Sequence, residues 1–302
     1  MRLAVAATPE VALPTLNALL KTSHDIAFII TQPDRPAGRG QELRESAVSD
    51  WARNHSIRVI KPAHAQELNG VLADIDLVIT IGYGVILPQE ILDIPTYGFI
   101  NLHFSLLPRW RGAAPVQRAI EAGDSITGVS VFQLDAGMDT GPIYTAREIA
   151  LDPQWTSADL FEVLAELGVP TLLDTLQDIA NEVLPTPQNQ EGATRAHKIS
   201  KAEANINWRQ PAQTIIRTIN AFTPTPGAWT TLKDSPIKIS GVSTNSESRL
   251  APGEIALVQG ELLVGTLDKS IAIAYLRPAG KREMPATAWA NGARLTLGDH
   301  FG

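Results

Sequence analysis

Three polar residues have the types and the spacing that acyl-group chemistry requires. Asn101 and His103 stand two residues apart at the end of a short apolar run, residues 99–103, which we predict to be a β-strand. Because side chains at i and i+2 of a strand point to the same side, the amide and the imidazole are expected to face one spot. Asp139 follows in a turn after a second predicted strand, residues 129–134. Together, such groups can stabilise a developing oxyanion and transfer a proton.

The elements that must position these residues alternate in type along the first half of the chain. Thr8 as N-cap and Pro9 at the first helical position predict the start of the first helix. Apolar runs predict strands at residues 3–7, 26–31, 58–60, 76–81, 99–103 and 129–134, and helices are predicted at 47–55, 65–72 and 157–184. This alternation is typical of an α/β domain with a mostly parallel sheet between helices, whose ligand site lies beyond the carboxyl ends of the strands.

The second half has a different pattern. Residues 185–204 are rich in polar and turn-forming residues and are expected to be a linker. After a short helix with Pro211 near its first turn, short β-type runs follow at 229–232, 237–240, 254–258, 262–267 and 271–276. Short strands separated by turn residues predict a small barrel.

Composition and charge exclude several classes of protein. The chain has 302 residues, which is enough for two domains, and no Cys, which excludes disulfides, thiolate metal sites and a Cys nucleophile and fits a reducing cytoplasm. No apolar run is long enough to span a membrane. The net charge is −7, yet residues 205–302 carry 10 Lys and Arg against 7 Asp and Glu. This positive half favours a polyanionic partner, although ordinary surface charge explains it equally well.

Common nucleotide and hydrolase motifs are absent. Gly82 and Gly84 follow a predicted strand, but Leu87 stands where a dinucleotide fingerprint has its third glycine. The chain has no phosphate-binding Gly-Lys-Ser/Thr loop, no H-E-x-x-H zinc motif and no G-x-S-x-G elbow, and its six His are scattered. We therefore predict no metal.

Several longer motifs resemble those of the methionyl-tRNA formyltransferase family of folate-dependent enzymes, and the resemblance runs along the whole chain. The N-terminal motifs are Thr31-Gln32-Pro33-Asp34-Arg35-Pro36-Ala37-Gly38-Arg39-Gly40, Asn101-Leu102-His103 with Ser105-Leu106-Leu107-Pro108-Arg109-Trp110-Arg111-Gly112, and Asp135-Ala136-Gly137-Met138-Asp139-Thr140-Gly141. The C-terminal ones are His197-Lys198-Ile199-Ser200-Lys201, Pro252-Gly253-Glu254-Ile255 and Pro278-Ala279-Gly280-Lys281-Arg282. Phe104 departs from the pattern, because the family usually has a small residue there, and its bulk could narrow the pocket.

The resemblance implies a fold, a reaction and a set of site residues. It implies a Rossmann-like catalytic domain over residues 1–184 and an OB-like β-barrel that binds tRNA over residues 205–302. The implied reaction moves the formyl group of 10-formyltetrahydrofolate to the amino group of methionyl-initiator tRNA in a cytoplasmic, monomeric enzyme. Asn101, His103 and Asp139 would be catalytic, with Asp139 orienting His103 and favouring its protonated form. The residues that would line the folate site are Ser105, Leu106, Leu107 and Pro108.

The same resemblance points to contacts with tRNA. Arg35 and Arg39 lie in a loop similar to the one that the family inserts at the tRNA acceptor end, and Lys198 and Lys201 are expected to face phosphates or simply solvent. A basic face of the barrel would consist of Arg209, Arg217, Lys233, Lys238, Lys281, Arg282 and Arg294. Trp110, Trp208 and Trp229 are expected to pack rather than to stack on bases.

Other roles remain open at this point. Taken singly, Asn101 could cap a turn, His103 could be a satisfied half-buried histidine and Asp139 could brace its turn. Together, and within the family motifs, they favour catalysis. The same three groups would also serve a formyltransferase acting on an amino sugar or another small amine, or a hydrolase that releases formate from the folate. A catalytically silent RNA-binding module is the alternative from another class.

Overall fold

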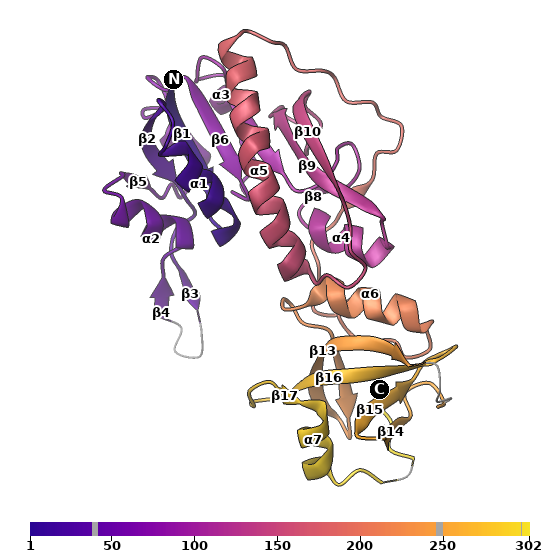
Figure 1. Cartoon of the computed structure of the whole chain (residues 1–302). Helices are drawn as coiled ribbons and strands as arrows, with labels where there is room; N and C mark the ends of the chain where they lie inside the picture. Colours follow the sequence, from indigo (N-terminus) through magenta and orange to yellow (C-terminus); the bar gives the residue numbers. More distant parts are fainter. Residues whose placement is uncertain (38–41, 246–249, 297) are drawn as a thin grey trace. The chain divides into compact units, whose positions relative to one another are not determined.

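The computed structural model describes residues 1–37, 42–245, 250–296 and 298–302, which form two compact units (Figure 1). Unit 1 comprises Met1–Pro115, Ile126–Ile149 and Phe161–Ala196. Unit 2 comprises Val116–Ser125, Ala150–Leu160 and His197–Gly302. Arg39, one of the predicted tRNA contacts, lies outside the described residues. None of the described helices has the length and apolar character needed to cross a membrane.

Unit 1 is built on a seven-stranded sheet in the order β10-β9-β7-β6-β1-β2-β5. Its strands are β1 (Arg2–Ala7), β2 (Asp25–Ile30), β5 (Val59–Ile60), β6 (Leu77–Ile81), β7 (Phe99–His103), β9 (Ile126–Gln133) and β10 (Ile143–Ala150). Neighbouring strands are parallel from β7 through β6, β1 and β2 to β5. Strand β9 runs antiparallel to β7. The predicted mostly parallel sheet is therefore confirmed, and its central strand β6 is buried along its whole length.

The helices of unit 1 differ in detail from the prediction. They are η1 (Glu10–Ala12), α1 (Leu13–Leu19), α2 (Ala47–Asn54), η2 (Ala65–Leu68), α3 (Gln89–Leu92) and α5 (Ser157–Ala180). The prediction of Thr8 as N-cap is wrong, because its hydroxyl oxygen accepts from the backbone N–H of Gln32, and a 3₁₀ turn precedes α1. Residues 65–72 were predicted to form a helix, but only the short 3₁₀ helix η2 forms there.

Three features of unit 1 escaped the sequence analysis. Helix α5 stops at Ala180 rather than at residue 184, because Glu182 adopts a left-handed conformation with φ of 58°. Strand β10 was not predicted, because it is a half-exposed edge strand that carries Arg147 and Glu148. A small hairpin of β3 (Arg35–Ala37) and β4 (Glu42–Arg44) was also not predicted.

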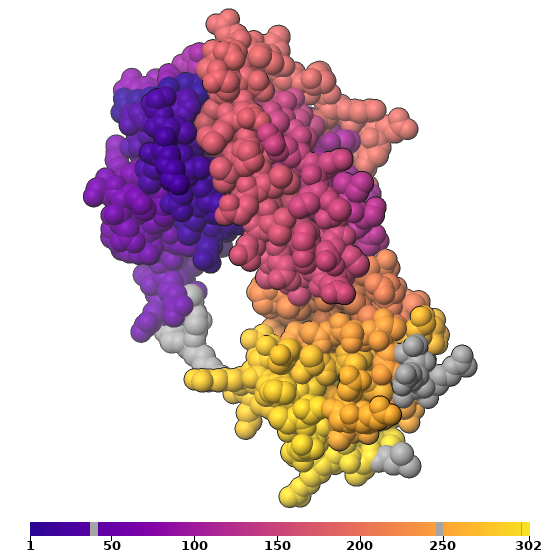
Figure 2. Space-filling model, viewed as in Figure 1, coloured from indigo at the N-terminus to yellow at the C-terminus, as the bar shows by residue number. Residues whose placement is uncertain are grey.

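Unit 2 contains an antiparallel sheet that curls into a half-barrel and packs against α6 (Ala212–Phe222) and α7 (Ala286–Ala293). The strands are β12 (Trp229–Leu232), β13 (Ser235–Asn245), β14 (Ile255–Val258), β15 (Glu261–Gly265), β16 (Ser270–Pro278) and β17 (Met284–Pro285). In Figure 2 its surface carries both the orange of α6 and the yellow of the last elements. The predicted small β domain is confirmed, while α7 and β17 were not predicted. α4 (Pro115–Ala122) also belongs largely to this unit.

The last residues of the chain connect the two edges of this sheet. The backbone N–H of Ile255 in β14 donates to Asp299, and Gly302 donates to the carbonyl of Thr231 in β12. Phe301 between them is 3% exposed and stacks on Trp208 at a centroid distance of 5.8 Å. The tail therefore supplies hydrogen bonds that the edge strands cannot supply to each other.

Candidate functional site

His103 lies at the carboxyl end of β7 and is 5% exposed. Its Nε2 lies 2.9 Å from the carbonyl oxygen of Trp110. Because a carbonyl oxygen only accepts, Nε2 carries a proton, and Nδ1 is the ring nitrogen that can gain or lose one. This arrangement fixes both the orientation and the tautomer of the imidazole.

Asp139 is brought to this ring from the turn after β9. Its Oδ2 lies 3.8 Å from His103 Nδ1 and accepts a 2.7 Å hydrogen bond from the backbone N–H of Gly112. The Asp139 side chain is only 17% exposed, so water screens its charge weakly. The carboxylate can thus stabilise positive charge on the ring when Nδ1 is protonated.

Asn101 lies two residues before His103 on β7, so both side chains project from the same face of the strand. The hydroxyl of Thr80, on the neighbouring strand β6, donates to Asn101 Oδ1 at 2.8 Å. Thr80 is paired directly with Asn101 in the parallel ladder. The structure therefore places the amide of Asn101 and the His103–Asp139 pair at one end of β7, as the strand pattern predicted.

The loop between β7 and α4 is held by buried hydrogen bonds. Ser130 of β9 is fully buried, and its hydroxyl accepts from Leu107 N–H at 3.1 Å while donating to the Ser105 carbonyl at 2.8 Å. The Ser105 hydroxyl donates to the Arg109 carbonyl at 2.6 Å. Ser105 and Leu107 are therefore anchored, whereas Leu106 and Pro108 are half-buried.

The end of this loop pairs with a distant part of the chain. β8 (Arg111–Gly112) forms a parallel ladder with β11 (Arg195–Ala196), and the Thr194 hydroxyl accepts from Trp110 N–H at 2.9 Å. Gly112 has φ of 125°, and an added Cβ would lie 2.7 Å from the Ala196 carbonyl oxygen. Only glycine fits there without distortion.

Comparisons with known proteins identify the family. The "Formyl transferase" family model matches residues 1–176, and the model for "Formyl transferase, C-terminal domain" matches residues 198–294. The methionyl-tRNA formyltransferase of Thermobifida fusca (strain YX) is 43% identical over 310 residues, covering 100% of this chain and 99% of that protein. The chain belongs to the methionyl-tRNA formyltransferase family.

Solved structures agree at the level of the fold. The methionyl-tRNA formyltransferase from Clostridium thermocellum has a TM-score of 0.60 at 17% identity, over 82% of this chain and 95% of that one. HypX from Aquifex aeolicus, solved in complex with tetrahydrofolic acid, has a TM-score of 0.68 at 19% identity, over 96% of this chain and 46% of that one. At such identities the likeness shows a shared architecture.

Phe104, the one departure from the family motifs, directly follows the last residue of β7. It is 6% exposed and packs edge-on against Phe161 of α5, with ring centroids 6.1 Å apart. Leu102 of β7 also approaches Gly168 of α5. The structure therefore places the bulk of the Phe104 ring against α5, and its effect on the folate pocket stays a prediction.

The residues predicted to contact tRNA are spread over the chain. Arg35 lies in the β3 hairpin of unit 1, is exposed and donates to Gln32 at 2.5 Å. Lys198 and Lys201 are exposed in unit 2. Trp229 and Trp208 both use their indole N–H within the fold, toward the Lys201 carbonyl and the Thr230 hydroxyl. The prediction that these Trp residues pack holds for both.

One part of the predicted basic face concentrates charge. Lys238 of β13 stands opposite Arg277 of β16 in the antiparallel register, and Arg277 was not singled out from the sequence. Burial lowers the pKa of Lys238, and the nearby charges of Arg277 and Lys201 lower it further. Like charges on paired strands are unfavourable. We call Lys201, Lys238 and Arg277 the basic cluster.

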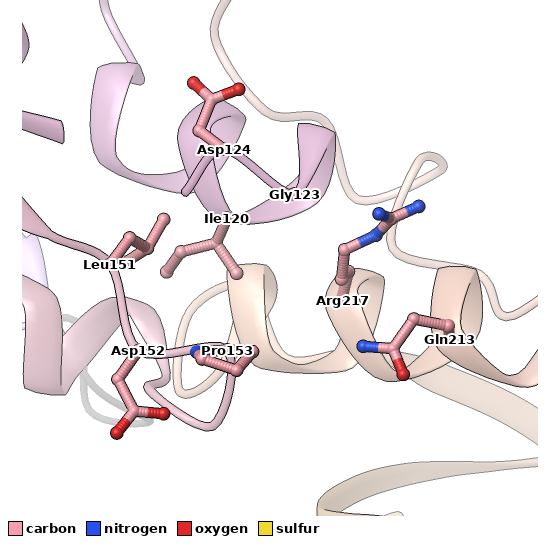
Figure 3. Close-up of a pocket in the computed structure, with 8 residues that line it drawn as sticks. All are labelled: Ile120, Gly123, Asp124, Leu151, Asp152, Pro153, Gln213 and Arg217. Atoms are coloured by element: carbon pink, nitrogen blue, oxygen red, sulfur yellow. The ribbon is translucent and has the colours of Figure 1, made fainter. Parts of the chain in front are cut away.

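Other members of the predicted basic face behave differently. Lys233 pairs with Asp299, with Nζ and Oδ1 3.2 Å apart, whereas Arg209, Lys281, Arg282 and Arg294 are exposed. Arg217 is half-buried and lines a pocket of about 110 Å³ within unit 2 together with Gln213, Asp124 and Asp152 (Figure 3). The side chains in this pocket include none of the predicted catalytic or folate residues.

Within the described ranges, no group of three or more His, Asp or Glu side chains is arranged to hold a metal ion.

The sequence analysis missed the segment after α5, where Gln188 and Thr194 contact the site loops. No sequence signal marks them, because they fall in a polar stretch that was expected to be a linker.

Proposed function

We propose that this protein transfers the formyl group of 10-formyltetrahydrofolate to the α-amino group of methionyl-initiator tRNA, with Asn101, His103 and Asp139 as its catalytic residues. The observation that carries this proposal is the meeting of the His103 ring and the Asp139 carboxylate at the end of β7, two residues beyond Asn101. Relatives named methionyl-tRNA formyltransferase match along the whole chain, which supports the choice of acceptor.

The chemistry assigns a role to each group. The amine attacks the formyl carbon and negative charge grows on the formyl oxygen. When the bond from the formyl carbon to N10 breaks, N10 of the folate leaves with a proton from His103, and the attacking nitrogen gives up a proton to the neutral imidazole that results. An amide N–H of Asn101 stabilises the oxyanion, and the loss of one such donor costs about 3 kcal/mol of transition-state stabilisation. The attacking α-amino group has a pKa of about 8, so a useful fraction is neutral near pH 7.

His103 supplies charge and a proton. Since Nε2 remains bonded to the Trp110 carbonyl, Nδ1 is the atom that holds the proton destined for N10. Asp139 stabilises the protonated ring from 3.8 Å, and Gly112 N–H keeps its carboxylate in place. The imidazole thus enters the reaction in one orientation, which is how positioning contributes to rate.

The folate is proposed to bind along Ser105, Leu106, Leu107 and Pro108. This loop leads directly from His103, and Ser130 fixes its backbone. A structural neighbour of the same architecture was solved with tetrahydrofolic acid, which supports a folate ligand. A donor held beside this loop would present its N10 near the carboxyl end of β7.

The tRNA is proposed to bind through Arg35, Arg39, Lys198 and the basic cluster. Lys238 and Arg277 repel each other across paired strands, and a phosphate between them would remove that repulsion. We assign catalysis to residues 1–184, a connecting role to 185–204 and tRNA binding to 205–302.

A direct assay tests the proposal. The protein is mixed with 10-formyltetrahydrofolate and methionyl-tRNA, and formyl-methionine is measured for the wild type and for Asn101→Ala, His103→Ala and Asp139→Ala. We expect each variant to lose at least about 100-fold in rate. Formate release without an acceptor would identify a hydrolase, and preference for a small amine over the charged tRNA would reassign the acceptor. Wild-type rates in all three variants would overturn the site.

A further inference from the structure

The side chain of Gln188 connects the two loops that meet at Asp139. Its Nε2 donates to the carbonyl oxygens of Asp139 and Gly141 at 3.0 and 2.7 Å. Its Oε1 accepts from Nε and Nη2 of Arg111 at 3.1 and 2.7 Å. We propose that Gln188 is a positioning residue for the formyl transfer, acting through Asp139. This inference rests on the function proposed above.

The turn that Gln188 holds has an unfavourable backbone conformation. Asp139 adopts φ of 55°, in the left-handed region that L residues other than glycine seldom occupy. Such a conformation persists only when the surroundings hold it. Gln188 binds the carbonyl of this residue and that of Gly141, two residues later, so it restrains the turn on both sides of Thr140.

The other end of the amide restrains the partner loop. Arg111 directly precedes Gly112, whose N–H holds the Asp139 carboxylate at 2.7 Å. Gln188 therefore holds the backbone of Asp139. It also holds Arg111, the neighbour of Gly112, whose N–H binds the Asp139 carboxylate. Displacement of either loop would alter the 3.8 Å separation between Asp139 Oδ2 and His103 Nδ1.

Only a primary amide of this length satisfies both loops. It presents two N–H donors toward two carbonyls and one oxygen toward a guanidinium. A carboxylate would serve Arg111 but would turn an oxygen toward the two carbonyls, and an aliphatic side chain would serve neither. The segment is itself anchored, because Thr194 and β11 pair with the end of the site loop.

The test compares Gln188→Ala and Gln188→Glu with a matched control, Gln190→Ala. Gln190 Oε1 also accepts from Arg111, at 3.1 Å from Nη1, but the donor to the carbonyls of the Asp139 turn is Gln188. Single-turnover rates and KM values are measured for both substrates, with thermal midpoints as the check on folding. We expect kcat to fall about 100-fold in both Gln188 variants, as misplacement of a catalytic group does, with KM within about threefold.

A double-mutant cycle with Asp139→Ala separates positioning from general structural damage. If Gln188 acts through Asp139, Gln188→Ala adds less than about threefold to the loss already caused by Asp139→Ala. A full multiplicative loss in the double variant would overturn the inference. So would a near-normal rate for Gln188→Glu, since it would mean that the Arg111 bond alone matters, or a loss in Gln190→Ala equal to that in Gln188→Ala.

The same data keep the two proposals apart. Asp139→Ala alone tests the proposed catalytic carboxylate, and a wild-type rate there contradicts that function whatever Gln188 does. A large loss in Asp139→Ala combined with an unchanged rate in Gln188→Ala contradicts only the positioning role.

Discussion

The end of β7 and the basic cluster of the half-barrel use polar residues in opposite ways. At the end of β7, His103 is buried and Asn101 and Asp139 are half-buried. Each side chain has a hydrogen-bond partner within the fold: Trp110 for His103, Gly112 for Asp139 and Thr80 for Asn101. In the basic cluster, Lys201 and Arg277 are exposed, and what they share with Lys238 is charge.

This difference teaches where a single substitution matters. A preorganised site depends on position, so a shift of about 1 Å can cost about 100-fold in rate. An electrostatic surface depends on summed charge, so each cation contributes a small and salt-dependent share.

The largest effect is expected for Gly112→Ala. The new Cβ would lie 2.7 Å from the Ala196 carbonyl at φ of 125°, so the loop must move and the N–H that holds Asp139 moves with it. We expect a loss of about 100-fold or more in single-turnover rate. Gly260→Ala is the matched control, because Gly260 also has positive φ, 84°, but nothing lies within 4 Å of an added Cβ. Equal activity in the two variants would show that the Gly112 contact does not position Asp139.

A smaller effect is expected for Arg277→Ala in the basic cluster. Affinity for methionyl-tRNA should fall about 3- to 10-fold at moderate salt, and the slope of log affinity against log salt should decrease by about 1, while kcat stays unchanged. Filter binding across a salt series measures this, with Lys21→Ala, an exposed lysine of unit 1, as control. An unchanged slope would remove the cluster from the tRNA interface.

The smallest effect is expected for Glu203→Gln, which tests an ion pair outside both regions. Hydrogen bonds from Arg118, at 2.7 Å, and from Ser200 lower the pKa of Glu203 from 4.5 to about 2. A lowered pKa stabilises the fold above about pH 4.5, and this contribution disappears as the pH falls toward 2. Because the Glu203 side chain is 40% exposed, we expect the variant to lose at most about 1 kcal/mol near pH 7.

Denaturant unfolding of wild type and Glu203→Gln between pH 2 and pH 7 checks this linkage. The two free energies of unfolding should converge as the pH falls toward 2 and reach their full separation above pH 4.5. A gap that is constant with pH would show that the ion pair contributes no net stability.

Much of unit 1 was predictable from local pattern. The buried strands β1, β2, β6 and β7 follow from apolar runs, and Asn101 and His103 share a face because strands have a period of two. Edge strand β10, which carries Arg147 and Glu148 in its exposed half, has no such signature and was missed.

The sequence by itself determined the order of the elements, the family motifs and the residue types at the end of β7. Only the tertiary structure decided that Gln188 reaches Asp139 and Arg111, that Phe104 packs on α5, and that the last residues bridge two strand edges. The physical reason is range. Periodicity and turn chemistry act over a few neighbouring residues, whereas a hydrogen bond between residues 49 or 77 positions apart exists only once the packed sheet has brought its two loops together.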